Sequence, residues 1–227
     1  MSRLLSILLA SFIPFFVIIL PVRAVFSPWL VHLEYSLPGF PPDPVAEFEP
    51  QRVMAPAERL RLGIEGLQGT SAVTGHAILS NMHFDNGQRV FDDREVKHLD
   101  DVRSIITIMF PIHTIVGVAA LITAILLARR SRTKLGAAVY AGAWLTISIV
   151  GVILVAAVVG WDAAFTAFHR LFFTGDSWLF NWDDALIRLY PVEFWQVITA
   201  LLGLAILAEC GLLLGIAARL RRIKPEA

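Results

Sequence analysis

Four long apolar runs separate the chain into membrane-spanning segments and the stretches that join them. A helix needs about 20 predominantly apolar residues to cross about 30 Å of hydrocarbon. Runs of this length fall within residues 1–25, 104–128, 135–160 and 194–218. The sequence therefore predicts an all-α membrane protein with four transmembrane helices.

The stretches between these runs differ in length and charge. Residues 26–103 are expected to form a small mixed domain and residues 161–193 an aromatic interfacial loop, whereas residues 129–134 and 219–227 are a short basic loop and a basic tail. Lys and Arg concentrate on the cytoplasmic flanks of membrane spans. The pattern predicts that both termini are cytoplasmic and that the two long stretches are extracytoplasmic.

The first apolar run could also be read as a secretory signal peptide, because Arg3 precedes it. Its apolar part is longer than the roughly 7–15 residues of such a peptide, and it lacks an Ala-x-Ala cleavage site. We therefore expect a retained span, kinked at Pro14 and Pro21. In the whole chain of 227 residues, 56% are hydrophobic and 17% are charged, and the net charge of zero gives no support for nucleic-acid binding.

The first extracytoplasmic stretch contains several local signals. Residues 37–56 include six prolines, which exclude regular helix and predict an extended connector. The apolar spacing in residues 57–67 predicts a short amphipathic helix closed by Gly69. Asn86 and Gly87, between two short runs of strand character, predict a two-stranded hairpin with a type I′ turn.

A helix that continues into the second span is expected to begin after Asp92, because Asp92 and Glu95 have the spacing of a capping box. His98 and Asp101 follow on that helix at successive steps of three residues, so either Glu95 or Asp101 could hold one imidazole nitrogen and leave the other free as a base. The alternative is an ordinary solvated helix end with mixed charges.

The second extracytoplasmic stretch is rich in aromatic side chains, which collect at the headgroup boundary of membranes. They include Trp161, Phe165, Phe168, Phe172, Phe173, Trp178, Trp182, Tyr190 and Trp195. Membrane anchoring accounts for most of them, but it does not account for His169 and Arg170 among them. Asp176 could orient His169 or cap a loop.

Three motifs carry a resemblance to a known family. They are EVKHLDDV at residues 95–102, FHRLFFTGDSWLF at residues 168–180 and LYPVEFW at residues 189–195. In this order, with the spans between them, the chain resembles the lipoprotein intramolecular transacylase family of bacterial four-span membrane proteins. The first motif departs from the family pattern at Leu99, where methionine is common.

The resemblance implies an enzyme that moves an acyl chain from the glyceryl ester of a diacylglyceryl-cysteine lipoprotein to the α-amine of the same cysteine. It implies His98 and His169 as the two functional histidines. The implied reaction needs neither a cofactor nor a metal. Supporting or substrate-positioning residues would be Glu95, Asp101, Arg170, Asp176 and Tyr190. Either histidine can be the general base; flanking carboxylates favour His98.

Other chemically notable residues receive structural interpretations. His113 and Glu209 lie inside spans, where we expect a helix-packing hydrogen bond for His113 and a pairing with an inner basic residue, or a protonated state, for Glu209. Cys210 is expected to be a small buried apolar residue. His76 and His83 could join His98 as metal ligands, but no HExxH or Cys-x-x-Cys spacing supports this.

Two other classes of function remain open from the sequence. A transporter should show broken or polar helices near the midplane and often inverted repeats, and neither pattern is evident in the last two spans. A non-enzymatic membrane scaffold, whose extracytoplasmic domain binds a partner, would fit the spans equally well but would not require the two histidines.

Overall fold

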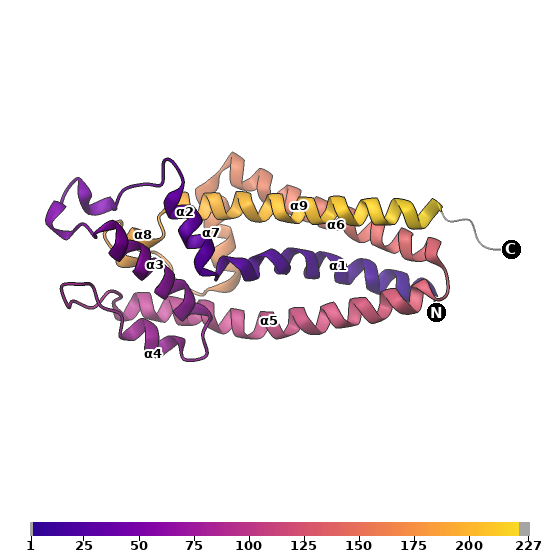
Figure 1. Ribbon diagram of the computed structural model, residues 1–227, viewed down its shortest axis with the longest axis horizontal. Helices are drawn as coiled ribbons and strands as arrows, with labels where there is room; N and C mark the ends of the chain where they lie inside the picture. The colour runs from indigo at the N-terminus through magenta and orange to yellow at the C-terminus, as the bar shows by residue number, and fades with distance from the viewer. Residues whose placement is uncertain (1, 223–227) are drawn as a thin grey trace. The chain divides into compact units, whose positions relative to one another are not determined.

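The computed structural model describes residues 2–222, and its regular elements are all helices (Figure 1). These are α1 (Ser2–Val25), α2 (Pro28–Ser36), the 3₁₀ turns η1 (Pro44–Ala46) and η2 (Pro50–Arg52), α3 (Pro56–Ser71), α4 (Gly75–Ser80), α5 (Asp93–Ala128), α6 (Arg132–Val159), α7 (Trp161–Phe172), α8 (Ala185–Leu189) and α9 (Val192–Arg222). The part of the predicted basic tail after Arg222 lies outside the described residues.

The four helices α1, α5, α6 and α9 are long and apolar enough to cross a membrane, which confirms the four predicted spans. α1 remains helical through both Pro14 and Pro21. The 36 residues of α5 extend for about 54 Å at 1.5 Å per residue, well beyond the hydrocarbon thickness. Charged residues are concentrated in residues 93–103, the first part of α5.

The chain forms two compact units. The bundle unit comprises the described parts of residues 1–23, 109–164 and 200–227, and thus most of the four spans. The second unit comprises residues 24–108 and 165–199, and thus the first predicted extracytoplasmic stretch and all but residues 161–164 of the second.

The core of the bundle unit is built from aliphatic and small side chains of all four spans. Its buried members are Leu9, Ile13, Val17, Leu127, Ala138, Val139, Val150, Ile206, Cys210 and Ala217. Cys210 is fully buried there, as predicted for a small apolar residue. At Gly142 an added Cβ would lie 2.8 Å from the Ile13 side chain, so this glycine lets α6 and α1 approach closely.

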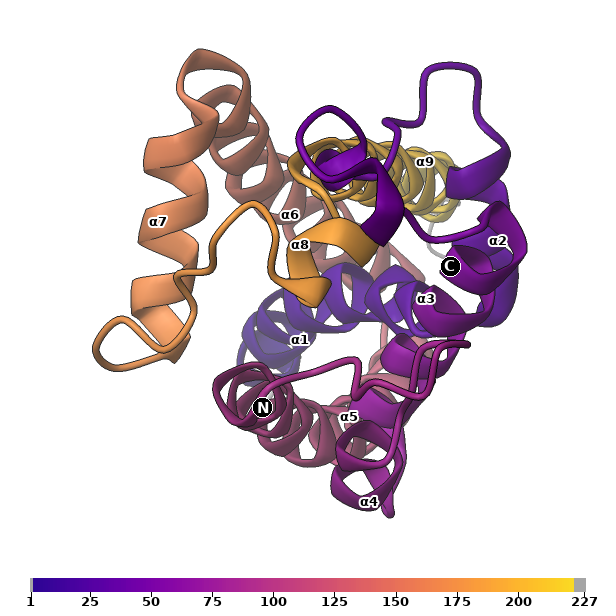
Figure 2. The same cartoon turned by 90° about the vertical axis from the view of Figure 1, so that its left-hand side faces the viewer.

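The second unit is organised around α3, which contacts α2, α4 and α8 (Figure 2). α3 continues to Ser71, so the prediction that Gly69 closes it was wrong. An added Cβ at Gly69 would lie 2.8 Å from Leu79 of α4. The glycine is therefore required for close helix packing, and it does not end the helix.

The predicted connector is confirmed, since residues 37–56 hold only the two short 3₁₀ turns before α3 begins. The predicted hairpin was wrong in its turn type, because Asn86 does not have the positive φ that a type I′ turn requires. Gly87 has φ +83°, and its N–H donates to the Phe84 carbonyl at 2.9 Å, which is a type I turn followed by a left-handed glycine. Between residues 82 and 91, a single antiparallel bridge forms, and it joins His83 and Arg89. The expected mixed domain is thus helical in the described residues.

Candidate active site

The first turn of α5 is fixed by a reciprocal pair of hydrogen bonds, as the capping-box pattern predicted. The Glu95 N–H donates to Asp92 Oδ1 at 2.7 Å, and the Asp92 N–H donates to Glu95 Oε2 at 2.8 Å. These bonds satisfy two of the backbone donors that a helix start leaves without partners. His98, three residues further along, therefore projects from a well-defined helix.

Glu95 does not hold the imidazole of His98, contrary to our expectation. Its second carboxyl oxygen, Oε1, accepts the Leu186 N–H at 2.7 Å, so the side chain connects α5 to α8. The side chain is only 3% exposed. Burial raises the pKa of Glu95 to about 7, although both backbone N–H groups oppose this shift. Glu95 is a positioning residue.

His98 is buried among aromatic rings. It is 7% exposed, and its ring centroid lies 5.0 Å from that of Phe173 and 5.4 Å from that of Phe180. Its Nδ1 has no hydrogen-bond partner within residues 2–222, and Asp101 is not bonded to it. Burial, and secondarily the nearby His169, lowers the pKa of His98 to about 4. The ring is therefore uncharged at neutral pH.

His169 lies on α7 in a defined tautomer. Its Nδ1 is 2.8 Å from the Phe165 carbonyl oxygen, and because a carbonyl only accepts, Nδ1 carries the hydrogen. The lone pair is then on Nε2. The ring stacks on Trp178 with centroids 4.8 Å apart. Burial lowers the pKa of His169, and the bond to Phe165 partly offsets this effect.

The structure brings together the two histidines that the sequence singled out. The centroids of His98 and His169 are 6.1 Å apart, and their planes are inclined by 26°. Phe173 borders both rings, at 5.0 Å from His98 and 5.8 Å from His169. The aromatic cage, which we define as Phe165, Phe173, Trp178 and Phe180, surrounds the pair. Two neutral imidazoles in apolar surroundings can accept and donate protons without a charged partner.

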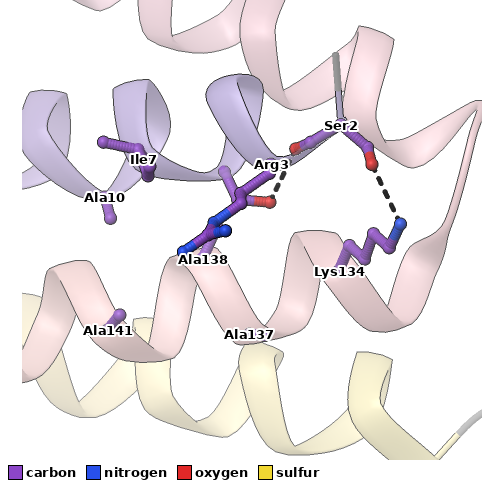
Figure 3. Close-up of a pocket in the computed structure, with 9 residues that line it drawn as sticks. Ser2, Arg3, Ile7, Ala10, Lys134, Ala137, Ala138 and Ala141 are labelled. Atoms are coloured by element: carbon purple, nitrogen blue, oxygen red, sulfur yellow. Dashed lines mark hydrogen bonds between the residues drawn. The ribbon is translucent and has the colours of Figure 1, made fainter.

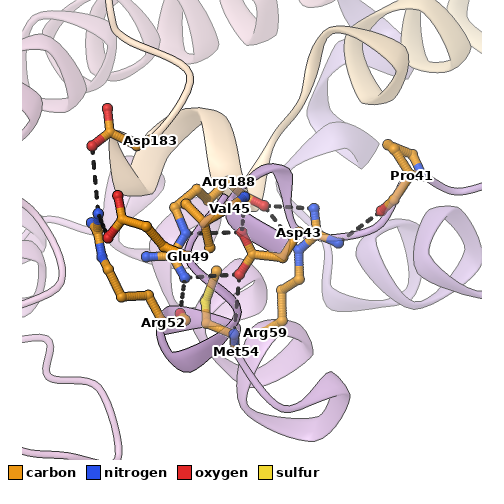
Figure 4. Close-up of polar contacts among 9 residues, drawn as sticks. All are labelled: Pro41, Asp43, Val45, Glu49, Arg52, Met54, Arg59, Asp183 and Arg188. Carbon is orange, nitrogen blue, oxygen red and sulfur yellow. Dashed lines mark hydrogen bonds and ion pairs between the residues drawn. The ribbon is translucent and has the colours of Figure 1, made fainter. Parts of the chain in front are cut away.

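A buried ion pair anchors α8, and with it the end of the loop that carries Trp178 and Phe180 (Figure 4). Arg188 donates from Nε to Asp43 Oδ1 at 2.9 Å and from Nη2 to Asp43 Oδ2 at 2.8 Å. Both residues are less than 5% exposed. Arg59 on α3 donates to the Arg188 carbonyl, at 2.6 Å from Nη2. Arg188 and Arg59 could not be recognised from the sequence, because nothing local distinguishes them from surface arginines.

Tyr190 is a positioning residue of the same region. It is 1% exposed, and its hydroxyl donates to the Gly63 carbonyl at 2.6 Å. An added Cβ at Gly66 would clash with that hydroxyl, so α3 needs glycine where Tyr190 packs. Burial raises the pKa of Tyr190 well above its usual value. Tyr190 therefore fixes the start of α9 against α3.

Arg170 and Asp176 are both exposed, and neither bonds to the histidine pair. Asp176 does not orient His169, because the Phe165 carbonyl has that position. Asp176 instead accepts the Leu179 N–H at its own carbonyl, in a turn. Any part these two side chains take in the chemistry must involve a bound substrate.

His76 and His83 do not join His98. His76 Nδ1 is 2.5 Å from Asp100 Oδ2, and His83 Nδ1 is 2.8 Å from the Asn81 carbonyl. Over the described part of the chain, no group of three or more His, Cys, Asp or Glu side chains is arranged to hold a metal ion.

In the bundle unit, His113 has the packing role that we predicted. It is 4% exposed, its Nε2 lies 3.0 Å from the Phe16 carbonyl, and its Nδ1 lies 3.2 Å from Arg23 Nη1. His113 thus joins α5 to both the backbone and the guanidinium of α1. Glu209 is half-buried on α9, and the structure gives it no ion pair with any of residues 2–222.

Three kinds of comparison with known proteins give consistent matches. The model of the family described as "Lipoprotein intramolecular transacylase Lit" matches residues 7–195. An uncharacterized protein of Aquifex aeolicus (strain VF5) is 30% identical over 195 residues, which are 86% of this chain and 84% of that protein. The solved structure of the membrane integral lipoprotein intramolecular transacylase Lit from Bacillus cereus has a TM-score of 0.68 at 20% identity, covering 97% of this chain and 95% of that one. A form of it in which one histidine is replaced by alanine has a TM-score of 0.73 at 20% identity, covering 97% and 93%.

Proposed function

The chain belongs to the lipoprotein intramolecular transacylase family and is an integral membrane acyltransferase, and from this premise we propose how His98 and His169 act. The proposed reaction moves an acyl chain from the glyceryl ester of a diacylglyceryl-cysteine lipoprotein to the α-amine of the same cysteine. The product is a lyso-form lipoprotein. The observation that supports this mechanism best is the pair of neutral imidazoles, 6.1 Å apart, in the aromatic cage.

We assign the proton transfers to His169. The amine nitrogen attacks the ester carbonyl, and a carbon–nitrogen bond forms while the nitrogen loses one proton. Nε2 of His169 has the lone pair that can accept this proton, because Nδ1 donates to Phe165. The glyceryl oxygen leaves when the carbon–oxygen bond breaks, and it takes the same proton from Nε2. One imidazole thus serves as base and then as acid, with no net uptake of protons.

His98 then acts on the charge that develops on the ester oxygen. Its pKa of about 4 makes it a weak base, but a neutral imidazole still offers one N–H donor. Such a donor in apolar surroundings is worth more than in water when it faces a developing oxyanion. This assignment reverses the expectation that His98 is the base, since the carboxylates that favoured it do not contact its ring.

No covalent acyl-enzyme is needed in this mechanism. The amine and the ester belong to one substrate molecule, so binding already supplies a large proximity effect. Cys210, the one cysteine, is buried in the core of the bundle unit and is not used.

We propose an orientation with both termini in the cytoplasm, because basic residues flank the ends of the spans on that side. They are Arg129, Arg130, Arg132, Lys134, Arg219, Arg221 and Arg222. His98 precedes the spanning part of α5, which begins at residue 104, by about 9 Å along the helix axis. In this orientation the histidine pair meets lipoprotein esters at the extracytoplasmic headgroup boundary.

The mechanism is tested by the N-terminal peptide of a lipoprotein from cells that have no other N-acylating activity. The transfer is intramolecular and leaves the total mass unchanged, so fragment ions must locate the acyl chain on nitrogen. We expect wild type to give the N-acyl form and His98→Ala and His169→Ala to lose it, with a rate decrease of about 10²–10⁴-fold. His76→Ala, an exposed histidine outside the cage, is the matched control and should retain activity. Full conversion by either cage variant would reject the mechanism.

The rate should depend on pH through the substrate and not through the histidines. Both imidazoles have lowered pKa values, about 4 for His98, and stay neutral above pH 6.5. An α-amine of pKa about 7.7–8.0 is protonated below that range and cannot attack. The single-turnover rate on a synthetic lipopeptide should therefore rise about tenfold per pH unit up to about pH 8 and then level off. A substrate with a less basic amine should shift this break downward; a break fixed near 6.5 for both substrates would contradict the lowered pKa values.

A further inference from the structure

A groove lies between the first turns of α1 and α6 in the bundle unit (Figure 3). Its volume is about 390 Å³. Arg3 and Ser2 line it from α1, and Lys134 lines it from α6. The groove belongs to the basic end of the bundle, far along the chain from the histidine pair, and the proposed reaction does not use it.

Within residues 2–222, no carboxylate neutralises the charges of the groove, because neither Arg3 nor Lys134 forms an ion pair with one. Lys134 Nζ donates to the Ser2 hydroxyl at 2.9 Å, and this bond holds the amine at the groove (Figure 3). Two cations and a hydroxyl that line one groove from two helices supply hydrogen-bond donors of the kind that a phosphate group accepts.

Apart from Ser6, the remaining lining of the groove is apolar. Ala10 of α1 and Ala137 and Ala141 of α6 continue the groove along the two spans. Positions 137 and 141 are one helical turn apart and lie on the same face of α6. Both are exposed in the bundle unit, and their small side chains leave a channel where larger residues would fill it. A ligand that fits therefore has an anionic head and an apolar chain.

We propose that this groove binds one anionic glycerophospholipid, with its phosphate between Arg3 and Lys134 and an acyl chain over the three alanines. Charge complementarity selects the anionic head. A soluble phosphate compound would leave the alanine channel unused, and that channel belongs to helices that cross the membrane. Basic pockets between transmembrane helices recognise lipid headgroups in this way.

The test is native mass spectrometry of the full-length protein with phosphatidylglycerol or phosphatidylcholine of identical acyl chains. We expect one phosphatidylglycerol to be retained in preference to phosphatidylcholine. Each basic residue near an anionic headgroup contributes a factor of about five, so Arg3→Gln with Lys134→Gln should weaken retention about thirtyfold. Arg219→Gln with Arg222→Gln removes the same charge outside the groove and is the matched control.

A second variant separates the site from general surface charge. Ala137→Leu keeps both cations but fills the channel, and it should also reduce retention of phosphatidylglycerol. Glycerol phosphate, a head without chains, should not displace the lipid. Equal retention of both lipids, unchanged retention in the double variant, or an equal loss in the matched control would each overturn the proposal. Size-exclusion profiles identical to wild type establish that the variants are folded.

Discussion

Replacing Arg188 by alanine is expected to lower the free energy of unfolding by about 3–5 kcal/mol, because it leaves a buried carboxylate without its partner. Arg188 holds Asp43 through two hydrogen bonds of 2.9 and 2.8 Å. Burial acts to raise the pKa of Asp43, but the bonds from Arg188 and from the Met54 N–H outweigh it and keep the pKa below its usual value. Asp43 therefore stays charged at neutral pH. Without the guanidinium, the free energy required to bury that charge is no longer offset.

Denaturant titration in detergent, followed by tryptophan fluorescence, measures this loss. Arg94→Ala is the matched control, since it breaks an ion pair with Asp184 in which the Arg94 side chain is 43% exposed, and such pairs contribute about 0–1 kcal/mol. Replacing both buried partners, as in Asp43→Leu with Arg188→Met, should recover much of the stability because no isolated charge remains. An Arg188→Ala protein as stable as the Arg94→Ala protein would show that the buried pair does not anchor α8.

The partners of Arg188 explain why this part of the fold could not be predicted from the sequence. Arg188 and Asp43 are 145 positions apart, and their ion pair depends on the packing of α3 against α8. No pattern of neighbouring residues in the sequence indicates such a contact. Gly66 gives a similar case, since its closeness to Tyr190 becomes visible only when the two segments meet. A glycine in a helical pattern is interpreted as the end of the helix when the residue that packs against it, far away in the sequence, is unknown.

Features that depend on nearby residues were predicted well. The four spans were predicted from uninterrupted runs of apolar residues. Such runs are needed wherever a helix crosses the hydrocarbon layer of the membrane. The start of α5 follows from Asp92 and Glu95, whose bonds close within one helical turn. The Asn86–Gly87 turn was predicted to within one residue but not in type, because the bond from the Gly87 N–H to the Phe84 carbonyl makes Asp85 and Asn86 the central residues.

The candidate site has features of both kinds, those that nearby residues determine and those that depend on distant contacts. The distance between His98 and His169 could not be calculated from the spacing of residues, and the resemblance of three motifs supplied the pairing. Residue chemistry then suggested carboxylates as partners, whereas the structure gives His169 a backbone carbonyl and leaves His98 Nδ1 without any partner in the described residues. Backbone partners are invisible in a sequence because every residue has a carbonyl.

The unpartnered nitrogen of His98 predicts that His98→Leu lowers the transacylation rate by about 10²–10⁴-fold while the free energy of unfolding stays within about 1 kcal/mol of wild type or rises. Leucine has a volume close to that of histidine, so the cavity cost is small. A buried polar atom that lacks a hydrogen bond costs about 1–3 kcal/mol, and leucine removes this cost. Tandem mass spectrometry of a lipopeptide product gives the rate, and denaturant titration gives the stability.

His113→Leu is the matched control, because it makes the same substitution at another histidine that is less than 10% exposed. Both nitrogens of His113 are engaged, by Phe16 and by Arg23, so its loss should lower the free energy of unfolding by about 1–3 kcal/mol. Replacing a histidine that serves packing by leucine lowers the stability of the protein. Replacing a histidine that serves the chemistry lowers the activity instead. If His98→Leu were destabilised as strongly as His113→Leu, the His98 ring would be a structural element of the cage, and the oxyanion role would have to be withdrawn.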